Sequence, residues 1–187
     1  MNRVIRQTGP GAAWHTAGKA GTTTHDMNAA NDVRLYGVDH VSGVLRQDGF
    51  YRRGSLEKLT TTDEDGHTTE TFTDNQGKTI LTVVVNGEER LETYYVYDYR
   101  ELLRWVLSPE ASHRIASSID TEVLYKYAYY YEYDALKRMT FKKLPGCEPV
   151  YMVYDKRDRL VLTQDGNMRQ STATDGAIRN ITQRTVP

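Results

Sequence analysis

YYYEYDALKRMTFK, residues 129–142, has two further copies in the chain when the segments are aligned on their Tyr-Asp pair: YYVYDYRELLRWVL (94–107) and VYMVYDKRDRLVLT (150–163). In each copy, large apolar or aromatic residues stand one and three positions before the Asp, and five and seven positions after it. They are Tyr95, Tyr97, Leu103 and Trp105, then Tyr131, Tyr133, Met139 and Phe141, then Met152, Tyr154, Leu160 and Leu162. A period of two on both sides of a short polar break predicts a β-hairpin that buries these residues on one face.

The Asp of each copy, Asp98, Asp134 or Asp155, is suited to start the turn of its hairpin. Its carboxylate accepts a hydrogen bond from the backbone N–H two residues further on. The residue three positions after the Asp is expected to take a positive φ, and two degenerate copies, at Asp63 and Asp74, have Gly there. The tyrosine copies instead have Glu101, Lys137 and Asp158 at this position, which predicts a backbone cost.

Shorter runs with strand-type alternation fill the chain between residues 31 and 97, and Asn86-Gly87 predicts a tight hairpin turn. Ser108, Pro109 and Glu110 form a helix start, because Ser caps, Pro needs no N–H partner there and Glu suits the positive end. We therefore expect an all-β protein with minor α content, built as an antiparallel sheet of stacked hairpin repeats with one short helix near 108–118. Three regions are expected: an irregular N-terminal arm (1–30), a β-repeat domain (31–167) and a polar, partly disordered tail (168–187).

The charge balance and the apolar runs exclude several classes of protein. The 24 basic and 25 acidic residues give a net charge of −1, which argues against a dedicated nucleic-acid binder. No run approaches the roughly 18 apolar residues of a membrane span, and the start of the chain has no apolar region of a secretory signal. Cys147 is the only cysteine, so no internal disulfide is expected.

No catalytic, cofactor or metal site is expected from the reactive side chains. The five histidines are His15, His25, His40, His67 and His113, and none pairs with another at a ligand-like spacing. Cys147 lies in PGCEP without a neighbouring base, and the acidic TTDEDG lacks the further ligands of a calcium loop. The sequence therefore indicates a protein that is not an enzyme.

The 14 tyrosines leave two interpretations open. Tyrosine suits strands with one dry and one wet face, but exposed tyrosines also bind protein partners and sugar rings. Tyr99, Tyr129 and Tyr130 stand outside the predicted inward positions, so a binding role is expected there first.

The Tyr-Asp copies resemble the YD repeats of RHS (rearrangement hotspot) proteins, whose consensus runs Tyr-Asp, two variable residues, Gly-Arg-Leu. The segments YYVYDYRELLRWVLSPEAS and LPGCEPVYMVYDKRDRLVLTQDG are similar to parts of the large RHS-repeat proteins of Bacteroides-type bacteria, and the resemblance covers residues 45–167. Many such repeats wind into a β-sheet shell in full-length members, often around a C-terminal toxic domain. Three clear and two degenerate copies are too few to close such a shell, and the Asp-Pro pair of its self-cleaving motif is missing here.

This resemblance implies a non-enzymatic structural and interaction module of an RHS-like cell-surface or secreted protein, corresponding to a fragment of a YD-repeat shell. Its repeats 97–98, 133–134 and 154–155 would be structural, comprising Tyr97, Asp98, Tyr133, Asp134, Tyr154 and Asp155. Because stacked repeats bury a core only against neighbours, we expect open sheet edges that are filled by self-association, a partner strand or the rest of a longer polypeptide. Two alternatives are a carbohydrate-binding module that uses the exposed tyrosines, with a glycan as partner, and a remnant of a polymorphic toxin.

Overall fold

The computed structural model describes residues 5–8, 12 and 20–169, which form an all-β protein with minor α content. The strands before the helices are β1 (Arg6–Gln7), β2 (Gly21–Met27), β3 (Arg34–Val38), β4 (Leu45–Phe50), β5 (Glu57–Thr62), β6 (Thr68–Thr73), β7 (Thr79–Asn86), β8 (Glu89–Tyr97) and β9 (Leu103–Leu107). Helices α2 (Pro109–Arg114) and α3 (Thr121–Tyr127) follow, and then β10 (Ala128–Tyr133), β11 (Met139–Lys143), β12 (Val150–Tyr154) and β13 (Leu160–Gln164). None of the helices in the described part of the chain is long and apolar enough to cross a membrane.

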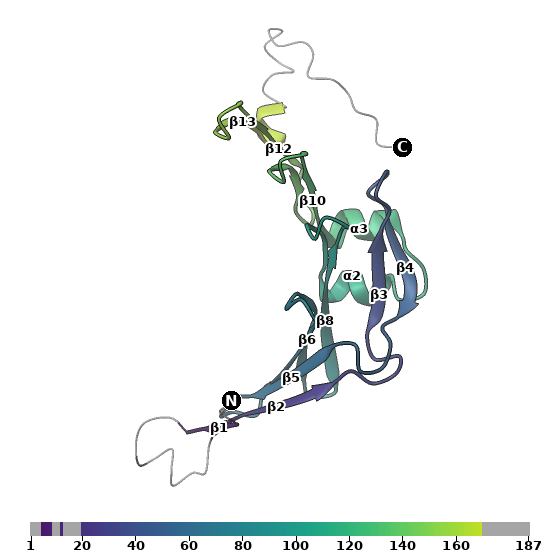
Figure 1. Ribbon diagram of the computed structural model, residues 1–187, viewed down its shortest axis with the longest axis vertical. Helices are drawn as coiled ribbons and strands as arrows, with labels where there is room; N and C mark the ends of the chain where they lie inside the picture. The colour runs from purple at the N-terminus through teal and green to yellow at the C-terminus, as the bar shows by residue number, and fades with distance from the viewer. Residues whose placement is uncertain (1–4, 9–11, 13–19, 170–187) are drawn as a thin grey trace.

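Eleven of the strands form one antiparallel sheet in the order β1-β2-β5-β6-β7-β8-β9-β10-β11-β12-β13. Each strand lies beside the next in the sequence, except that the β3–β4 hairpin forms a separate two-stranded sheet between β2 and β5. Figure 1 shows the resulting long, twisted ribbon of strands, with α2, α3 and the β3–β4 hairpin all on the same side of it. The predicted sheet of consecutive antiparallel hairpins is confirmed.

The irregular arm predicted for residues 1–30 is wrong in its second half. Residues 21–27, GTTTHDM, form strand β2, which pairs along its whole length with β5. Most of these residues are exposed, so the strand lacks the apolar alternation that would reveal it in the sequence. Its β-branched threonines lie opposite the threonines of β5, an arrangement that suits a pleated surface. The predicted tail from residue 170 onward lies outside the described residues.

Each Asp-initiated turn has the same hydrogen-bond pattern, which the Asp134 turn illustrates. The Oδ1 atom of Asp134 accepts the backbone N–H groups of Leu136 and Arg138, at 2.9 Å each. The Asp134 N–H donates to the Arg138 carbonyl at 3.0 Å, and the Lys137 N–H donates back to the Asp134 carbonyl at 3.1 Å. The turns at Asp63, Asp74, Asp98 and Asp155 repeat all four bonds. One carboxylate oxygen therefore satisfies two turn N–H groups in every copy, and the first of these bonds is the one the sequence predicts.

The third residue after each of these Asp residues has a positive φ, as the sequence predicts. The two glycines at this position, Gly66 and Gly77, have φ of 89° and 81°. Glu101, Lys137 and Asp158 have φ of 66°, 64° and 62° despite their side chains. A side chain in this left-handed region costs roughly 1–2 kcal/mol relative to the right-handed one.

The predicted burial of Tyr95 and Tyr97 together with Trp105 on one dry face is wrong. The deeply buried residues of β8 are the even-numbered Tyr94 and Val96, with 1% and 3% of their surfaces exposed, and Tyr95 and Tyr97 are half-buried on the opposite face. The register shifts by one residue beside the turn, between Val96 and Tyr97, so the spacing does not carry a single face through the turn. Equivalent shifts occur beside the Asp74, Asp134 and Asp155 turns.

The core lies between the middle of the sheet and the elements that cover it. Tyr94 and Leu107 meet Ala111 and Ile115 of α2, all at 1% exposure or less. Helix α2 begins as predicted, with the Ser108 side chain accepting the Ala111 N–H and Pro109 in the first turn. Helix α3 was not predicted. Its cap is Asp120, whose side chain accepts the Glu122 N–H at 2.8 Å.

Replacing Lys137 by Gly is expected to stabilise the protein. The Lys137 side chain is exposed at a φ of 64°, so removing it relieves the left-handed strain without removing packing. After the larger chain entropy of glycine is subtracted, the gain should be about 0.5–1 kcal/mol. Urea unfolding measures it, and Lys142→Gly in the middle of β11 is the control, expected to lower the free energy of unfolding. A loss of stability in both variants would contradict the turn assignment.

Candidate interaction site in the row of aspartate turns

Four of the aspartate turns lie side by side along one long side of the sheet. They begin at Asp74, Asp98, Asp134 and Asp155 and join β6 to β7, β8 to β9, β10 to β11 and β12 to β13. Because consecutive strands are antiparallel, every second connection falls on the same side of the sheet. We call these four connections the turn row. The Asp63 turn and the Asn86-Gly87 turn lie on the opposite side.

Side chains link each turn of the row to the next. The Lys78 Nζ of the first turn lies 3.1 Å from Glu101 Oε1 of the second. The Arg138 guanidinium of the third lies 2.7 Å from Asp158 Oδ1 of the fourth and donates to the Asp155 carbonyl at 3.2 Å. In both links, the cation four residues after one Asp pairs with the acidic residue three positions after the next. The two links therefore connect equivalent positions of neighbouring hairpins.

The link between the second and third turns departs from this pattern at both positions. Leu102 replaces the cation, and the positive-φ residue that follows in the third turn is Lys137. A cation at position 102 would therefore face a like charge. Arg100 supplies the link instead, because its guanidinium donates to the Asp134 carbonyl at 2.8 Å.

Two arginines neutralise the buried carboxylate of the second turn. The Asp98 side chain is only 3% exposed, and its Oδ2 lies 3.6 Å from both Arg100 and Arg104. A buried carboxylate without such neighbours would be strongly destabilising. Arg100 thus contacts the carboxylate of its own turn and the backbone of the next turn.

In the three turns that begin with Tyr-Asp, the tyrosine also contacts the preceding hairpin. The Tyr97 hydroxyl donates to the Thr79 carbonyl at 3.2 Å, and the Tyr133 hydroxyl donates to the Leu103 carbonyl at 3.0 Å. Thr79 and Leu103 both stand five residues after the Asp of the preceding turn. The ring of Tyr154 instead lies 4.9 Å below the Arg138 guanidinium. In the Tyr-Asp pair, Asp therefore closes its own turn and Tyr contacts the hairpin before it.

Asn28 begins a further turn on the same side, into which a whole hairpin is inserted. Its Oδ1 accepts the Leu56 N–H at 2.8 Å, its N–H donates to the Leu56 carbonyl at 3.0 Å, and its carbonyl accepts the Gly54 N–H at 3.0 Å. The two bonds between Asn28 and Leu56 match those between each turn Asp and the fourth residue after it, with residues 29–55 between the partners. Asn28 is 1% exposed, and its Nδ2 donates to the Arg52 carbonyl at 2.9 Å. An amide supplies both donor and acceptor there without a buried charge.

The inserted hairpin covers the sheet next to the turn row. The Trp105 Nε1 donates to the Gly43 carbonyl at 3.2 Å, and the Tyr130 hydroxyl accepts from Arg104 at 2.8 Å just beside Gly43. A Cβ on Gly43 would lie 2.5 Å from the Tyr130 hydroxyl. The tip of the β3–β4 hairpin therefore rests directly on these three side chains.

The structure places the three tyrosines predicted for binding in different surroundings. Tyr99 is 77% exposed at the Asp98 turn, edge-on to His40. Tyr129 lies opposite Val106 and shares the face of Tyr95, so it is not outside that register. Tyr130 points to the opposite face and packs against Trp105 and Phe141. The three do not form a common surface.

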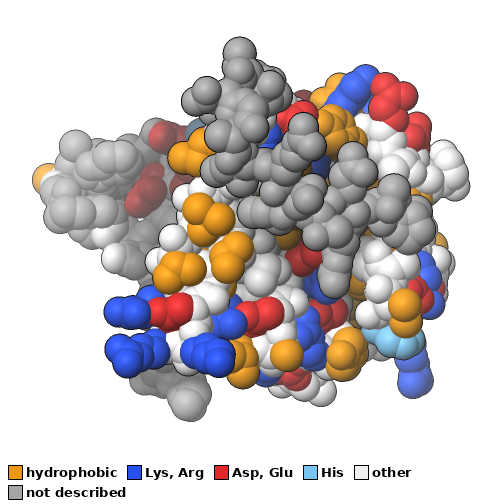
Figure 2. Space-filling view, turned by 90° about the horizontal axis from the view of Figure 1, so that it is seen from above, with side chains coloured by type: hydrophobic (Ala, Val, Ile, Leu, Met, Phe, Trp, Pro, Cys, Tyr) orange, Lys and Arg blue, Asp and Glu red, His pale blue; other side chains and the backbone are white. Residues whose placement is uncertain are grey.

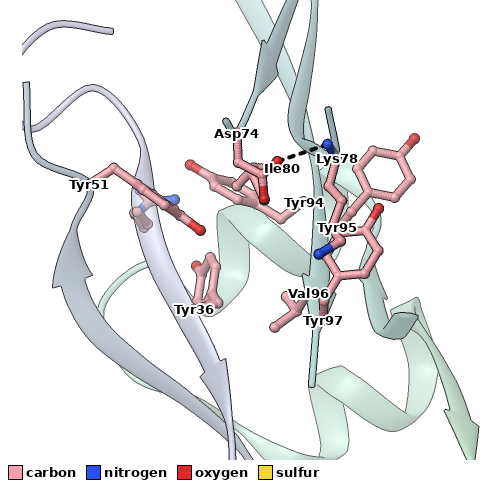
Figure 3. A pocket seen from close by; sticks show the side chains of 10 residues that line it. Tyr36, Tyr51, Asp74, Lys78, Ile80, Tyr94, Tyr95, Val96 and Tyr97 are labelled. Atoms are coloured by element: carbon pink, nitrogen blue, oxygen red, sulfur yellow. Dashed lines mark hydrogen bonds between the residues drawn. The ribbon is translucent and has the colours of Figure 1, made fainter. Parts of the chain in front are cut away.

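A small cavity between the inserted hairpin and the sheet is lined by other tyrosines. They are Tyr36, Tyr51 and Tyr94, with Asp74 and Lys78 at the turn above them. Figure 3 shows Tyr36 and Tyr51 facing Tyr94 and Asp74 across it. The buried Tyr36 hydroxyl has no hydrogen-bond partner in the described part of the chain, and burial raises the pKa of this hydroxyl. The volume is about 120 Å³, below the roughly 300–1,000 Å³ of ligand pockets.

The remaining reactive side chains do not converge. In the described residues, no three His, Cys, Asp or Glu side chains are arranged to hold a metal ion. Cys147 is exposed. An open hollow of about 680 Å³ lies beside His113, where Glu110 and Arg114 pair with each other.

Among the described residues, no further turn follows the last turn of the row, as one follows each of the other three. Arg159 binds its own Asp155 through Nε and the NH2 nitrogen, at 2.8 Å each, as Arg138 binds Asp134. The Arg159 side chain is 67% exposed, against 22% for Arg138. The hydrogen bond from the Arg159 N–H lowers the pKa of Asp155, partial burial opposes the change, and the guanidinium adds to it. Asp155 thus stays ionised beside a largely free guanidinium.

Apolar side chains accompany Arg159 on β13, the last strand of the sheet. Leu160, Val161 and Leu162 are 50%, 58% and 47% exposed, and Val153 of β12 is 47% exposed. Among the described residues β13 pairs only with β12, so its outer edge has unpaired backbone groups. Figure 2, which looks onto this end of the molecule, shows hydrophobic side chains beside a group of basic and acidic ones.

Sequence reasoning missed the contacts between turns. It predicted the Asp and the positive-φ residue of each turn, but not that the charge of that residue is matched to the preceding copy. The sequence does contain a signal for these contacts, which is the matching of charges between neighbouring copies. It is seen when three pairs are compared: Lys78 with Glu101, Leu102 with Lys137, and Arg138 with Asp158. The Asn28 turn has no comparable signal, because 27 residues separate its two halves.

The link between the third and fourth turns is expected to behave as a coupled pair. Asp158→Lys places a cation beside Arg138 and should destabilise the protein, but the same change in an Arg138→Leu background reproduces the Leu102–Lys137 arrangement. The double-mutant cycle should give a coupling free energy of about 0.5–1 kcal/mol that falls with added salt. The backbone cost of Lys at this position cancels in the cycle. Urea unfolding of the four proteins measures the coupling free energy, and strictly additive effects would contradict the link.

The close approach at Gly43 is expected to make it much less tolerant than Gly54. Both glycines have a φ of 73°, but a Cβ on Gly54 meets nothing within 4 Å. Gly43→Ala and Gly54→Ala therefore share the backbone cost, and only the first displaces Tyr130. Gly43→Ala should cost about 1–3 kcal/mol more. Thermal unfolding with Trp105 fluorescence tests this, and equal costs would show that the hairpin tip does not rest on the sheet.

Comparisons of the sequence with known proteins do not identify a family. No protein-family model matches the sequence, and no curated protein is significantly similar to it. The resemblance to YD repeats of RHS proteins therefore stays a prediction.

Proposed function

We propose that this protein is a non-enzymatic structural and interaction module that takes part in a longer array of YD-type hairpins. The supporting observation is that the last hairpin has an exposed strand edge and an exposed guanidinium. Arg159 and the outer edge of β13 lack, in the described residues, the contacts that the preceding hairpins make with their successors. A further hairpin placed there would pair the edge and cover Leu160, Val161 and Leu162.

The energetics favour this function over an isolated sheet. Each hairpin of the row gains a strand interface, a tyrosine contact and an ion pair or hydrogen bond between turns from its neighbour, so an end hairpin is the least stable part of an array. The three half-exposed apolar residues of β13 would also bury more surface on pairing, at roughly 25 cal/mol per Å². As a fragment of an RHS-like shell the module would belong to a cell-surface or secreted protein.

The state of the β13 edge in solution tests the proposal. Amide hydrogen exchange of the full chain is expected to be fast in β13 and slow in β7 and β8 at the centre of the sheet. If the protein self-associates, Val161→Lys on the edge should dissociate it, because charged side chains block edge pairing. Val84→Lys is the matched control, since Val84 is 43% exposed on the central strand β7.

One result would contradict the proposal. A monomer by light scattering at all concentrations, with β13 amides as protected as those of β7, would show that the chain covers its own edge. In that case the hairpins form a closed unit and the array function fails.

A further inference from the structure

We propose that Arg159 selects the partner of the β13 edge by charge, and that the partner is a hairpin with an acidic residue three positions after its turn Asp. This inference rests on the array function proposed above and names the chemistry of the partner. It concerns the order in which hairpins associate, which backbone pairing alone does not determine, because an unpaired strand edge accepts any strand.

The three successive links in the row define the selection. Lys78 faces Glu101, and Arg138 faces Asp158, so a cation is followed by an acid in both cases. Leu102 occupies the cation position where the next turn has Lys137. The residue four positions after one Asp and the residue three positions after the next Asp are therefore oppositely charged in two of the three links and carry like charges in none.

Arg159 is held in the orientation that Arg138 uses for its link. Both guanidinium groups bind the Oδ2 of their own Asp through Nε and the NH2 nitrogen. In Arg138 the remaining nitrogen, NH1, contacts Asp158 and the Asp155 carbonyl. The NH1 of Arg159 makes no hydrogen bond to any described residue, and it is oriented for the same two acceptors.

The same comparison specifies the rest of the partner's turn. Arg138 lies over the Tyr154 ring, and Lys78 lies 5.9 Å from the centre of the Tyr97 ring. An aromatic residue directly before the turn Asp therefore adds a cation–π contact. The partner predicted for Arg159 is a hairpin of the form aromatic-Asp-x-x-(Asp or Glu).

A second folded copy of this protein does not supply such a hairpin. In the turn row, the acidic residues at the third position are Glu101 and Asp158, and each is already paired with the preceding turn of its own chain. The inference therefore commits to a hairpin that lies outside residues 1–187. This partner hairpin would place an acidic side chain beside the exposed Arg159 guanidinium and would pair a strand with β13.

The hairpin that Arg138 already contacts provides the probe. A cyclised peptide of residues 150–164, VYMVYDKRDRLVLTQ, carries the acid, and its Asp158→Lys version carries a cation at the same position. Cyclisation is needed because isolated two-stranded hairpins are marginally stable. Both peptides are checked by circular dichroism and titrated into the full chain by isothermal calorimetry at low salt.

The wild-type protein is expected to bind the acidic peptide about five- to tenfold more tightly than the lysine peptide, with a preference that fades as salt rises. Arg159→Leu should remove the preference, and the Leu102 turn shows that Leu is accommodated at this position. Arg157→Leu, which removes the same charge from the same turn, is the control and should keep the preference.

Equal affinity for both peptides in the wild-type protein would overturn the charge selection and leave the array function standing. Binding of neither peptide, with protected β13 amides, would overturn both, because the chain's own tail then covers the edge. A homodimer through β13 that Arg159→Leu does not weaken would also overturn the inference.

Discussion

The hydrogen bonds that one aspartate oxygen accepts from two turn N–H groups are the interaction on which the rest of this structure depends. The pattern recurs at Asp63, Asp74, Asp98, Asp134 and Asp155 with bonds of 2.8–3.0 Å. It makes a turn with a positive φ at its third following residue stable enough to tolerate a side chain there. The turns at Asp74, Asp98, Asp134 and Asp155 also share a one-residue shift in register, so that their hairpins present equivalent positions to one another. The ladder of contacts along the row follows from that equivalence.

The repeated turn also explains how the sheet carries an additional element without losing its order. At Asn28 the same bonds join residues 28 and 56, and the β3–β4 hairpin leaves and returns through the gap between them. The two flanking strands, β2 and β5, still pair directly in full register. Because the turn is closed by its end residues, the residues between them are free to form the cover over Trp105 and Tyr130. The core of the protein is thus built by an insertion into one repeat together with the α2–α3 connection between β9 and β10.

The sequence predicts the hairpins well and their faces poorly, for one physical reason. Asp and the residue three positions later act within a single turn, so local spacing was enough to place them. Which residues are buried depends on what covers the sheet and on the register shift beside each turn, and neither is local. Tyr94 is therefore buried where Tyr95 was expected, and β2 was missed because polar threonines fill both of its faces. For the candidate site, the spacing identified the turns but not the contacts between them, because the partner of Arg138 stands 20 residues further along the chain.

The charges of the turn row explain why hairpins with similar backbones have non-interchangeable sequences. Backbone pairing alone would stabilise the hairpins in any order, because every strand offers the same donors and acceptors. An exchange of the second and fourth turns would bring Arg159 against Lys137, a pair of like charges. Exposed ion pairs contribute little to stability, on the order of 0.2–1 kcal/mol each, but a repulsive contact in the wrong order adds the same amount with the opposite sign. The acidic and basic residues at the third and fourth positions therefore act mainly on which hairpin lies beside which, and the tyrosine and aspartate between them supply the stability common to all.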